Sequence, residues 1–336
     1  MKIAQISPGI LPIPPKKWGA IEEIIWQYKL NFEKLGHDVD IIYADQVEPN
    51  MYDIVHLHVG RFAKHSDHLD GGLHQRGVEY IFTMHDVSSY MFGKHHPIYK
   101  QNEEAIINSL FSTVGCKAFR NIFSFDCCEK IEWLLHGADT DFFSCSPFSG
   151  EHKILCVGAK ENRKQFHLAV ESAKILNLPI TIVGPERDKH YCDNYLNSIN
   201  YNKLTLINNS DKSELKNIHK DHSILIHPSI CETGNPCLAV MEAMSSGLPV
   251  VGTNMDSLTN FKQDRFPDMH EIPGFIHCFQ NSFDIAEKIK LIINNYENYQ
   301  NQARRFALNN SWEKVCQRII DLHQYHTLKN KLFKYV

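Results

Sequence analysis

The chain has 336 residues, 43% of them hydrophobic and 22% charged, a balance typical of globular proteins that excludes disorder as the main state. At about 150 residues per domain, this length predicts two domains. No run approaches the roughly 18 apolar residues that a membrane-spanning helix needs, and the net charge of −4 gives no overall sign of a polyanionic partner.

In the first half, short apolar strands alternate with an amphipathic helix, which is typical of parallel βαβ units. Apolar residues recur at helical spacing from Ile21 to Leu35, and Gly36 ends this helix. We predict strands at residues 2–6, 39–43, 54–57 and 80–84.

The pattern restarts after Pro147. We predict strands at residues 153–158, 179–184, 203–207, 223–227 and 249–252, and helices at residues 166–176, 212–219 and 239–246. A further helix begins at Ser311. The chain is therefore expected to be an α/β protein with two Rossmann-like domains in tandem, whose ligands bind beyond the carboxyl ends of the strands.

Two loops that join a strand to a helix are candidate anion sites. The first, Pro14 to Glu22, contains Gly19, and amides at a helix start favour an anion; the alternative is an ordinary proline-rich turn. The second holds Lys160, Arg163 and Lys164, which suit a diphosphate or form a solvated charged turn. Residues 1–150 carry a net charge of −6 and residues 151–336 a net charge of +2, so a phosphate is expected to bind in the second half.

A third loop of this kind runs from Pro228 into the helix at residues 239–246. Residues Thr233 to Pro236 can expose consecutive amides to an oxyanion or a sugar hydroxyl. Glu242 could accept two ribose hydroxyls, or could merely stabilise its helix.

Short motifs along nearly the whole chain resemble one family, the family-4 retaining glycosyltransferases of GT-B fold. The matching segments are Pro14-Pro15 with Trp18–Glu22, Gly36–Val39, Asp53–His58, Thr83–Asp86, His136–Phe143, Gly158–Gln165, Glu232 with Glu242–Val251, and Ser311–Glu313. The resemblance implies an acceptor-binding domain at residues 1–147 and a nucleotide-sugar-binding domain at residues 148–310. It also implies that the two domains face a central cleft and that the helix at residues 311–336 returns to the first domain.

The resemblance also assigns roles in transfer from a nucleotide-sugar, expected to be a UDP-sugar. Lys164 would neutralise the diphosphate, Glu242 would hold the ribose, and Gly19 would approach the phosphates. Glu232 would orient the sugar with the amides of Gly234, Asn235 and Pro236, and His85 would contact the sugar near the reacting centre.

Two positions depart from the family pattern. The arginine of the usual Arg and Lys pair falls on Ala159, so Lys160 or Arg163 would supply the missing charge. The usual spacing of two glutamates places Gly234 eight residues before Glu242, whereas Glu232 lies two residues farther upstream.

Neither a metal nor another cofactor is expected. Asp139-Thr140-Asp141 matches the turn before the second domain in the family pattern, and not a metal site. His56 and His58 share one face of a strand, where a structural role is favoured over zinc. Ten cysteines without regular spacing indicate reduced thiols in a cytoplasmic protein.

The acceptor stays open among saccharides, lipid-linked molecules and other small molecules. Some viral enzymes of this fold glycosylate hydroxymethylated DNA bases, so a DNA acceptor is an alternative, although the acidic first half disfavours it. A sugar-nucleotide epimerase and a catalytically weak sugar-nucleotide-binding protein are further alternatives.

Overall fold

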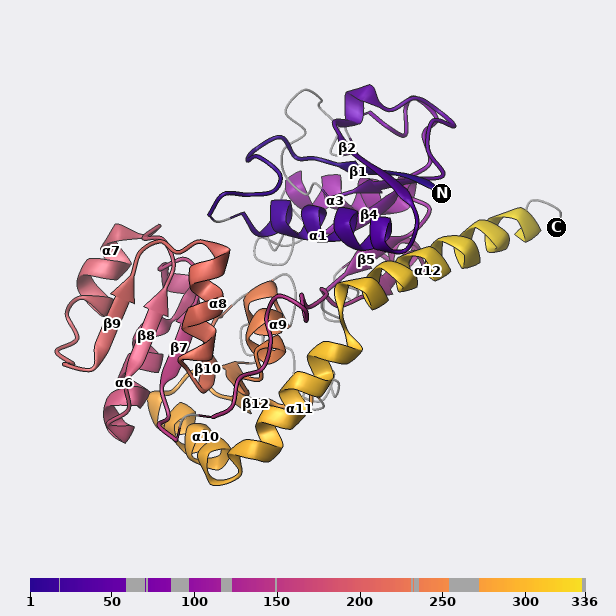
Figure 1. Ribbon diagram of the computed structural model, residues 1–336. Helices are drawn as coiled ribbons and strands as arrows, with labels where there is room; N and C mark the ends of the chain where they lie inside the picture. Colours follow the sequence, from indigo (N-terminus) through magenta and orange to yellow (C-terminus); the bar gives the residue numbers. More distant parts are fainter. Residues whose placement is uncertain are drawn as a thin grey trace. The chain divides into compact units, whose positions relative to one another are not determined.

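The computed structural model of the chain divides into two compact units (Figure 1). It describes residues 1–17, 19–58, 70, 72–85, 97–115, 123–148, 150–230, 232, 236–253 and 272–333. The first unit contains Met1–Gly137, Thr233–Pro236 and Trp312–Val336, and the second contains Ala138–Glu232 and Cys237–Ser311. Each unit is built on one six-stranded parallel sheet.

The first sheet has the strand order β2-β1-β3-β4-β5-β6. Its strands are β1 (Lys2–Ile6), β2 (Asp38–Ile42), β3 (Ile54–Leu57), β4 (Ile81–Met84), β5 (Ser112–Val114) and β6 (Ile131–Trp133). The helices of this unit are α1 (Ala20–Lys34), the 3-10 turn η1 (Ala44–Gln46), α3 (Pro97–Asn108), α5 (Phe125–Cys128) and α12 (Trp312–Phe333). The strands predicted in this half all form.

Helix α12 packs against α1, which confirms that the end of the chain returns to the first unit. Trp312 is 1% exposed, and its ring lies edge-on to Tyr28 with centroids 5.2 Å apart. A Cβ on Gly137 would lie 2.4 Å from the Trp312 ring, so only glycine fits there. Gly137 and Trp312, which both belong to motifs noted in the sequence, therefore have a structural role in packing α12 against the first unit.

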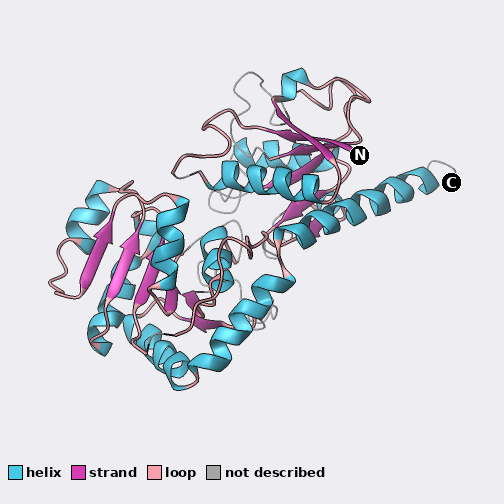
Figure 2. Cartoon of the chain, viewed as in Figure 1, coloured by secondary structure: helices cyan, strands magenta, loops and turns pink. Residues whose placement is uncertain are grey.

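The second sheet has the order β12-β11-β10-β7-β8-β9, with helices on its faces (Figure 2). Its strands are β7 (Ile154–Val157), β8 (Ile180–Val183), β9 (Leu204–Ile207), β10 (Ile224–His227), β11 (Val250–Thr253) and β12 (Phe275–Cys278). The helical segments are η2 (Asn162–Lys164), α6 (Phe166–Leu176), α7 (Lys189–Tyr191), η3 (Cys192–Leu196), α8 (Lys212–Lys220), α9 (Leu238–Ser245), α10 (Ser282–Asn294) and α11 (Tyr296–Asn309).

The central strands β7, β10 and β11 of the second sheet are almost entirely buried on both faces, as expected for a doubly wound sheet. In β7, Ile154 and Cys156 point into a core formed with α6 and α10, whereas Leu155 points into a second core formed with α9 and α11. This alternation fixes the register, because a slip of one residue would exchange the two cores.

The boundary between the units lies about ten residues before the predicted one. The expected boundary was Pro147, but the first unit ends at Gly137. The segment that follows is bound to the second unit: the Phe143 carbonyl accepts hydrogen bonds from Ser245 Oγ at 2.8 Å and from Arg304 Nη1 at 3.0 Å. These contacts join residues far apart in the sequence and hold the segment after Gly137 on the second unit.

Candidate functional site

Two loops of the second unit, one after β7 and one after β10, form the candidate site. The two strands are parallel neighbours, so their carboxyl ends lie at one edge of the sheet, where ligands bind in such sheets. The first loop leads through Gly158 into η2, and the second leads to Glu232 and α9. The backbone NH of Ile230 donates to the Arg163 carbonyl at 2.8 Å and ties the loops together.

One carboxylate oxygen, Glu232 Oε1, is the point on which these loops converge. It accepts hydrogen bonds from Lys164 Nζ and, at 2.7 Å, from Ser229 Oγ. Arg163 Nη1 and His227 Nε2 each lie 3.2 Å from the same oxygen. The Lys164 and Glu232 side chains are only 8% and 13% exposed. We call these five residues the Glu232 cluster.

Glycine makes room for Lys164 at the end of β7. Gly158 has a φ of +147°, a conformation that favours glycine, and an added Cβ would lie 3.3 Å from Lys164 Cε. At the end of β8, a Cβ on Gly184 would lie 1.9 Å from the Gly158 carbonyl oxygen. The two strand ends therefore approach so closely that neither position accepts a side chain without a shift of the backbone or of Lys164.

The cluster holds its carboxylate ionised and its imidazole protonated. Burial alone would raise the pKa of Glu232, but Lys164, His227 and Arg163 together lower it well below its usual range. Burial would lower the pKa of His227, but Cys237 and Glu232 raise it to about 9. Cys237 Sγ lies 3.6 Å from His227 Nε2. Burial raises the pKa of this thiol, and the His227 charge more than offsets that effect and lowers it.

Three of these groups could also serve as metal ligands. The ligand atoms of His227, Glu232 and Cys237 all lie within 4.8 Å of one another, and this N, O and S set suits zinc. A metal ion would compete with Lys164 and Arg163 for Glu232 Oε1, because both cations already lie on that oxygen. This competition favours the cations, and the expectation of catalysis without metal stays a prediction.

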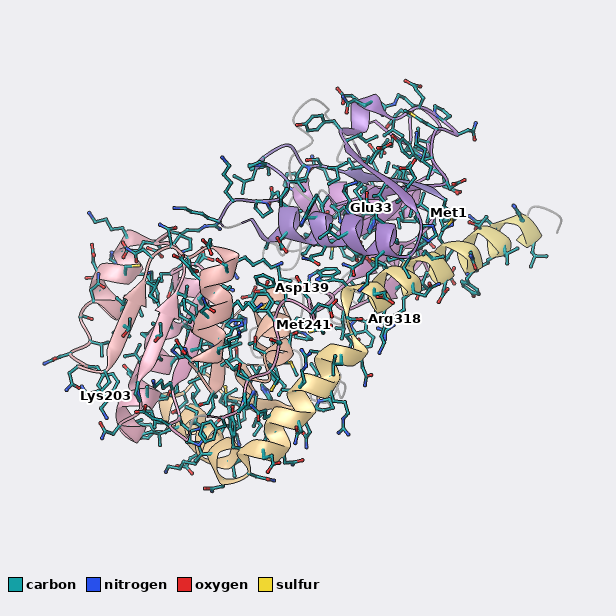
Figure 3. The ribbon with its side chains drawn as sticks, viewed as in Figure 1. Met1, Glu33, Asp139, Lys203, Met241 and Arg318 are labelled. Carbon is teal, nitrogen blue, oxygen red and sulfur yellow. The ribbon has the colours of Figure 1, made fainter. Side chains whose placement is uncertain are left out.

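The Asp139-Thr140-Asp141 segment lies at the start of the second unit, where Asp139 makes contacts within that unit. Asp139 Oδ2 accepts a hydrogen bond from Lys212 Nζ at 3.2 Å, and Asp139 Oδ1 accepts one from the Phe142 NH at 3.2 Å. Figure 3 shows Asp139 near α9, which carries Met241. The metal-ligand group found among the described residues does not include Asp139 or Asp141.

Lys160 follows the same strand as Lys164 but lies apart from the Glu232 cluster. The residue is fully buried, and its Nζ donates to Asn208 Oδ1 and, at 3.3 Å, to the Ile207 carbonyl at the end of β9. Its backbone forms a bridge with Glu186. The structure therefore brings Arg163 and Lys164 together at Glu232 and directs the ammonium group of Lys160 toward β9.

The remaining donor-site predictions concern Glu242 of the second unit and the loop before α9, of which Pro236 groups with the first unit. Glu242 lies in the second turn of α9 and is 8% exposed. Pro236 is buried just before Cys237, the residue that precedes the first turn of α9. Gly234 and Asn235 lie outside the described residues, so their predicted contact with a sugar stays a prediction.

The first unit holds the other two predicted site residues, Gly19 and His85. Gly19 precedes the first turn of α1 with a φ of +148°, and an added Cβ would lie 3.0 Å from Glu22 Oε2 and 3.1 Å from Leu11 Cδ1. His85 follows β4 and is half-buried, with its Nε2 3.2 Å from His58 Nδ1. Both predicted residues therefore lie next to a sheet or helix end, where backbone or ring atoms can meet a ligand.

Residues 138–308 match the family described as glycosyl transferases group 1, which covers the whole Glu232 cluster and half of the chain. The chain belongs to the group 1 glycosyltransferases. The prediction that it is a glycosyltransferase is thereby confirmed. No curated protein sequence matches the chain at a significant level.

Solved glycosyltransferase structures share the fold of this glycosyltransferase along nearly its whole length. HepE from Anabaena, solved with UDP and glucose, is 13% identical, with a TM-score of 0.71 over 97% of this chain and 100% of that one. The catalytic domain of starch synthase IV from Arabidopsis thaliana, solved with ADP and acarbose, is 12% identical, with a TM-score of 0.68 over 97% and 99%. A glycosyltransferase from Rickettsia africae is 15% identical, with a TM-score of 0.67 over 97% and 98%. At these identities the likeness shows the fold alone, and it confirms the predicted GT-B fold.

Sequence reasoning missed three groups at the candidate site of this glycosyltransferase: His227, Ser229 and Cys237. His227 is the last residue of a predicted strand, at the sheet edge where Lys164 was already expected. That position was a usable signal, because side chains at the carboxyl end of a parallel strand face the ligand edge. Cys237 gave no such signal, since its approach to His227 depends on the path of the loop before α9.

Proposed function

We propose that this protein is a retaining family-4 glycosyltransferase that moves a sugar from a UDP-sugar to a hydroxyl acceptor without a metal ion. The observation that carries the proposal is the convergence of Lys164 and Arg163 on Glu232 at the carboxyl edge of the second sheet. This cluster lies inside the region that matches the family. HepE was solved with UDP-glucose and starch synthase IV with ADP, which supports a nucleoside diphosphate as the leaving group here.

The charges of the cluster suit a diphosphate leaving group. Cleavage of the bond between the sugar and the diphosphate builds negative charge on the phosphate oxygens, and fixed cations stabilise that charge. Lys164 and Arg163 supply two such cations, and His227, with its pKa raised to about 9, supplies a third at neutral pH. We infer that Lys164 is the principal contact, because its permanently charged side chain is 8% exposed, whereas that of Arg163 is 32% exposed.

Glu232 acts in this proposal as a fixed carboxylate. Its lowered pKa keeps it ionised, so it cannot donate a proton to the leaving group. A diphosphate needs no such proton. The ionised carboxylate can instead orient sugar hydroxyls with the backbone NH groups of Gly234 and Asn235, while positive charge develops on the sugar ring as in glycosidases.

Retention follows from attack on the same face that the diphosphate leaves. The acceptor oxygen forms the new bond to the anomeric carbon, the bond to the diphosphate breaks, and the leaving phosphate takes the acceptor proton. His85 and Gly19 of the first unit would contact the sugar and the phosphates, and Glu242 would hold the ribose.

The acceptor is proposed to be a saccharide, a lipid-linked molecule or another small molecule, and a DNA acceptor is kept for testing. None of the helices among the described residues is long and apolar enough to cross a membrane. The eight cysteines that the structure describes are all free thiols, which supports a reducing compartment such as the cytoplasm.

The test of this proposal is turnover of UDP-sugars followed by proton NMR with EDTA present. We expect release of UDP and a product whose anomeric configuration equals that of the donor. An inverted product would contradict retention, and activity that disappears with EDTA would contradict metal independence. Tight donor binding without any transfer or hydrolysis would favour the alternative of a catalytically weak sugar-nucleotide-binding protein.

A further inference from the structure

Four histidines gather in the first unit around the carboxyl ends of β3 and β4. His56 and His58 share one face, as predicted, with ring centroids 3.9 Å apart. The His58 and His85 centroids are 5.5 Å apart, and those of His85 and His136 are 5.7 Å apart. His56 and His58 are fully buried and His136 is 6% exposed, whereas His85 is half-buried. His85 is therefore the one ring of these four that is partly exposed, and buried rings lie on either side of it.

A chain of hydrogen bonds connects the core to His85. Gln5, the fourth of the five residues of β1, places its Oε1 2.5 Å from His58 Nε2. The other nitrogen of that ring, His58 Nδ1, lies 3.2 Å from His85 Nε2. Among the described residues, none forms a hydrogen bond with His85 Nδ1. The order of atoms is therefore Gln5 Oε1, the two nitrogens of His58, then Nε2 of His85.

Burial keeps both rings neutral. Burial, reinforced by the neighbouring histidines, lowers the pKa of His58 and of His85 well below the usual range. A neutral imidazole carries one NH and one lone pair. The state of one nitrogen in each ring therefore fixes the state of the other.

The amide oxygen of Gln5 sets the direction of the chain, because a carbonyl oxygen can only accept. His58 Nε2 must then carry the proton, so His58 Nδ1 must accept, and His85 Nε2 must donate. We propose that Gln5 and His58 are positioning residues that hold His85 in the tautomer protonated at Nε2, so that its Nδ1 lone pair is presented to substrate as a hydrogen-bond acceptor.

The burial of Gln5 supports this role. The residue is fully buried, and its Nε2 has no hydrogen-bond partner among the described residues. An apolar side chain at this position would avoid an unpartnered buried NH₂ group. Packing alone would not favour a glutamine whose NH₂ group stays unpaired. Its contact with His58, which decides which ring nitrogen carries the proton, explains the residue better.

The consequence for substrate choice rests on the proposed function. A neutral acceptor nitrogen takes a hydrogen bond from a sugar hydroxyl, whereas a carboxylate offers no proton and would face a lone pair. We therefore infer that the sugar group which meets His85 is a hydroxyl, and that neutral hexoses are used in preference to uronic acids. One such hydrogen bond corresponds to a preference of about tenfold in kcat/KM.

Nitrogen NMR of the full chain with ¹⁵N-labelled histidine tests the tautomer directly, with His85 assigned by its absence from a His85→Ala variant. In the wild type we expect His85 Nε2 to be protonated and Nδ1 to be unprotonated at neutral pH. Gln5→Leu should shift both His58 and His85 toward mixed tautomers.

His56→Phe is the matched control. His56 lies on the same face, and its ring is tilted by 40° against that of His58, but its Nε2 is 2.7 Å from Thr83 Oγ1, outside the chain to His85. The His85 signals should therefore stay unchanged in this variant. A wild-type His85 protonated at Nδ1, as a reversed Gln5 amide would require, overturns the inference, and so does a Gln5→Leu variant that folds with an unchanged His85 spectrum.

Comparison of UDP-glucose with UDP-glucuronate separates this inference from the proposed function. If the tautomer is as expected but no nucleotide-sugar is turned over, the proposed function fails and the positioning role stands. If transfer occurs and His85 has the opposite tautomer, the positioning role fails alone. Equal use of both sugars with the expected tautomer would refute the inferred preference for a hydroxyl.

Discussion

Replacement of Lys164 by methionine removes one buried cation and keeps most of the side-chain volume. The ammonium is one of four groups on Glu232 Oε1, so the carboxylate keeps Arg163, His227 and Ser229. Loss of the sole partner of a buried charge costs about 3–5 kcal/mol. With three partners left, we expect a loss nearer to one charged hydrogen bond, about 1.5–3 kcal/mol of unfolding free energy.

The same substitution should affect turnover more than its effect on folding explains. Removal of one preorganised group that stabilises developing charge lowers kcat by about 10²–10³-fold. We expect a loss of this size in a UDP-sugar hydrolysis or transfer assay, run at a temperature where urea denaturation shows the variant to be folded. The binding of UDP should weaken as well, because the diphosphate keeps its charge in the product.

Lys160→Met is the matched comparison for this experiment. Lys160 follows the same strand and is fully buried, but its ammonium group lies on Asn208 and the Ile207 carbonyl. We expect a comparable loss of stability with a much smaller loss of kcat. The reasoning is refuted if Lys164→Met folds and keeps the wild-type kcat/KM, or if the two variants lose turnover equally.

Three further predictions concern groups outside this pair of lysines. Cys237 should react with iodoacetamide at neutral pH faster than the exposed Cys145, because the His227 charge lowers the pKa of the Cys237 thiol. Peptide mapping would measure both rates, and His227→Gln should remove the difference. The folded state raises the pKa of His227 from an ordinary value of about 6.5 to about 9, so its contribution to stability is complete below pH 6.5 and is lost as pH rises through 9. Urea midpoints should therefore fall over this range and fall less in His227→Gln, and an unchanged slope would contradict the assignment. Gly137→Ala should cost about 1–3 kcal/mol in urea denaturation, because its Cβ would lie 2.4 Å from the Trp312 ring, and a neutral effect would mean that this contact relaxes freely.

Much of the fold could be predicted from local patterns. The strands of the second sheet through β11 are short apolar runs bounded by glycine, proline or charged residues, and all of them form where expected. Strands β5 and β6 have only three residues each, too few to show a period. Helices α10 and α11 follow each other with only Asn295 between them, so the sequence offers no clear break there.

Residues of the candidate site could be predicted only where they belong to a short sequence motif. Lys164 and Glu232 were identified because each belongs to a short motif, and the structure brings them into contact. Lys160 was grouped with Lys164 because both follow β7, yet its backbone bridge to Glu186 turns it toward β8 and β9. His227 joins the cluster through the pairing of β7 with β10, a non-local contact that the spacing of residues cannot show.

The most direct test of the central claim is a thermal-shift panel of UDP-, GDP-, ADP- and TDP-sugars with EDTA present. A ligand that binds only the native state raises the melting temperature. We expect a clear shift with a UDP-sugar that persists in EDTA, survives in Lys160→Met and is lost in Lys164→Met. The absence of any shift in the wild type, or a shift that Lys164→Met retains in full, would contradict the claim that the Glu232 cluster holds the diphosphate of a nucleotide-sugar.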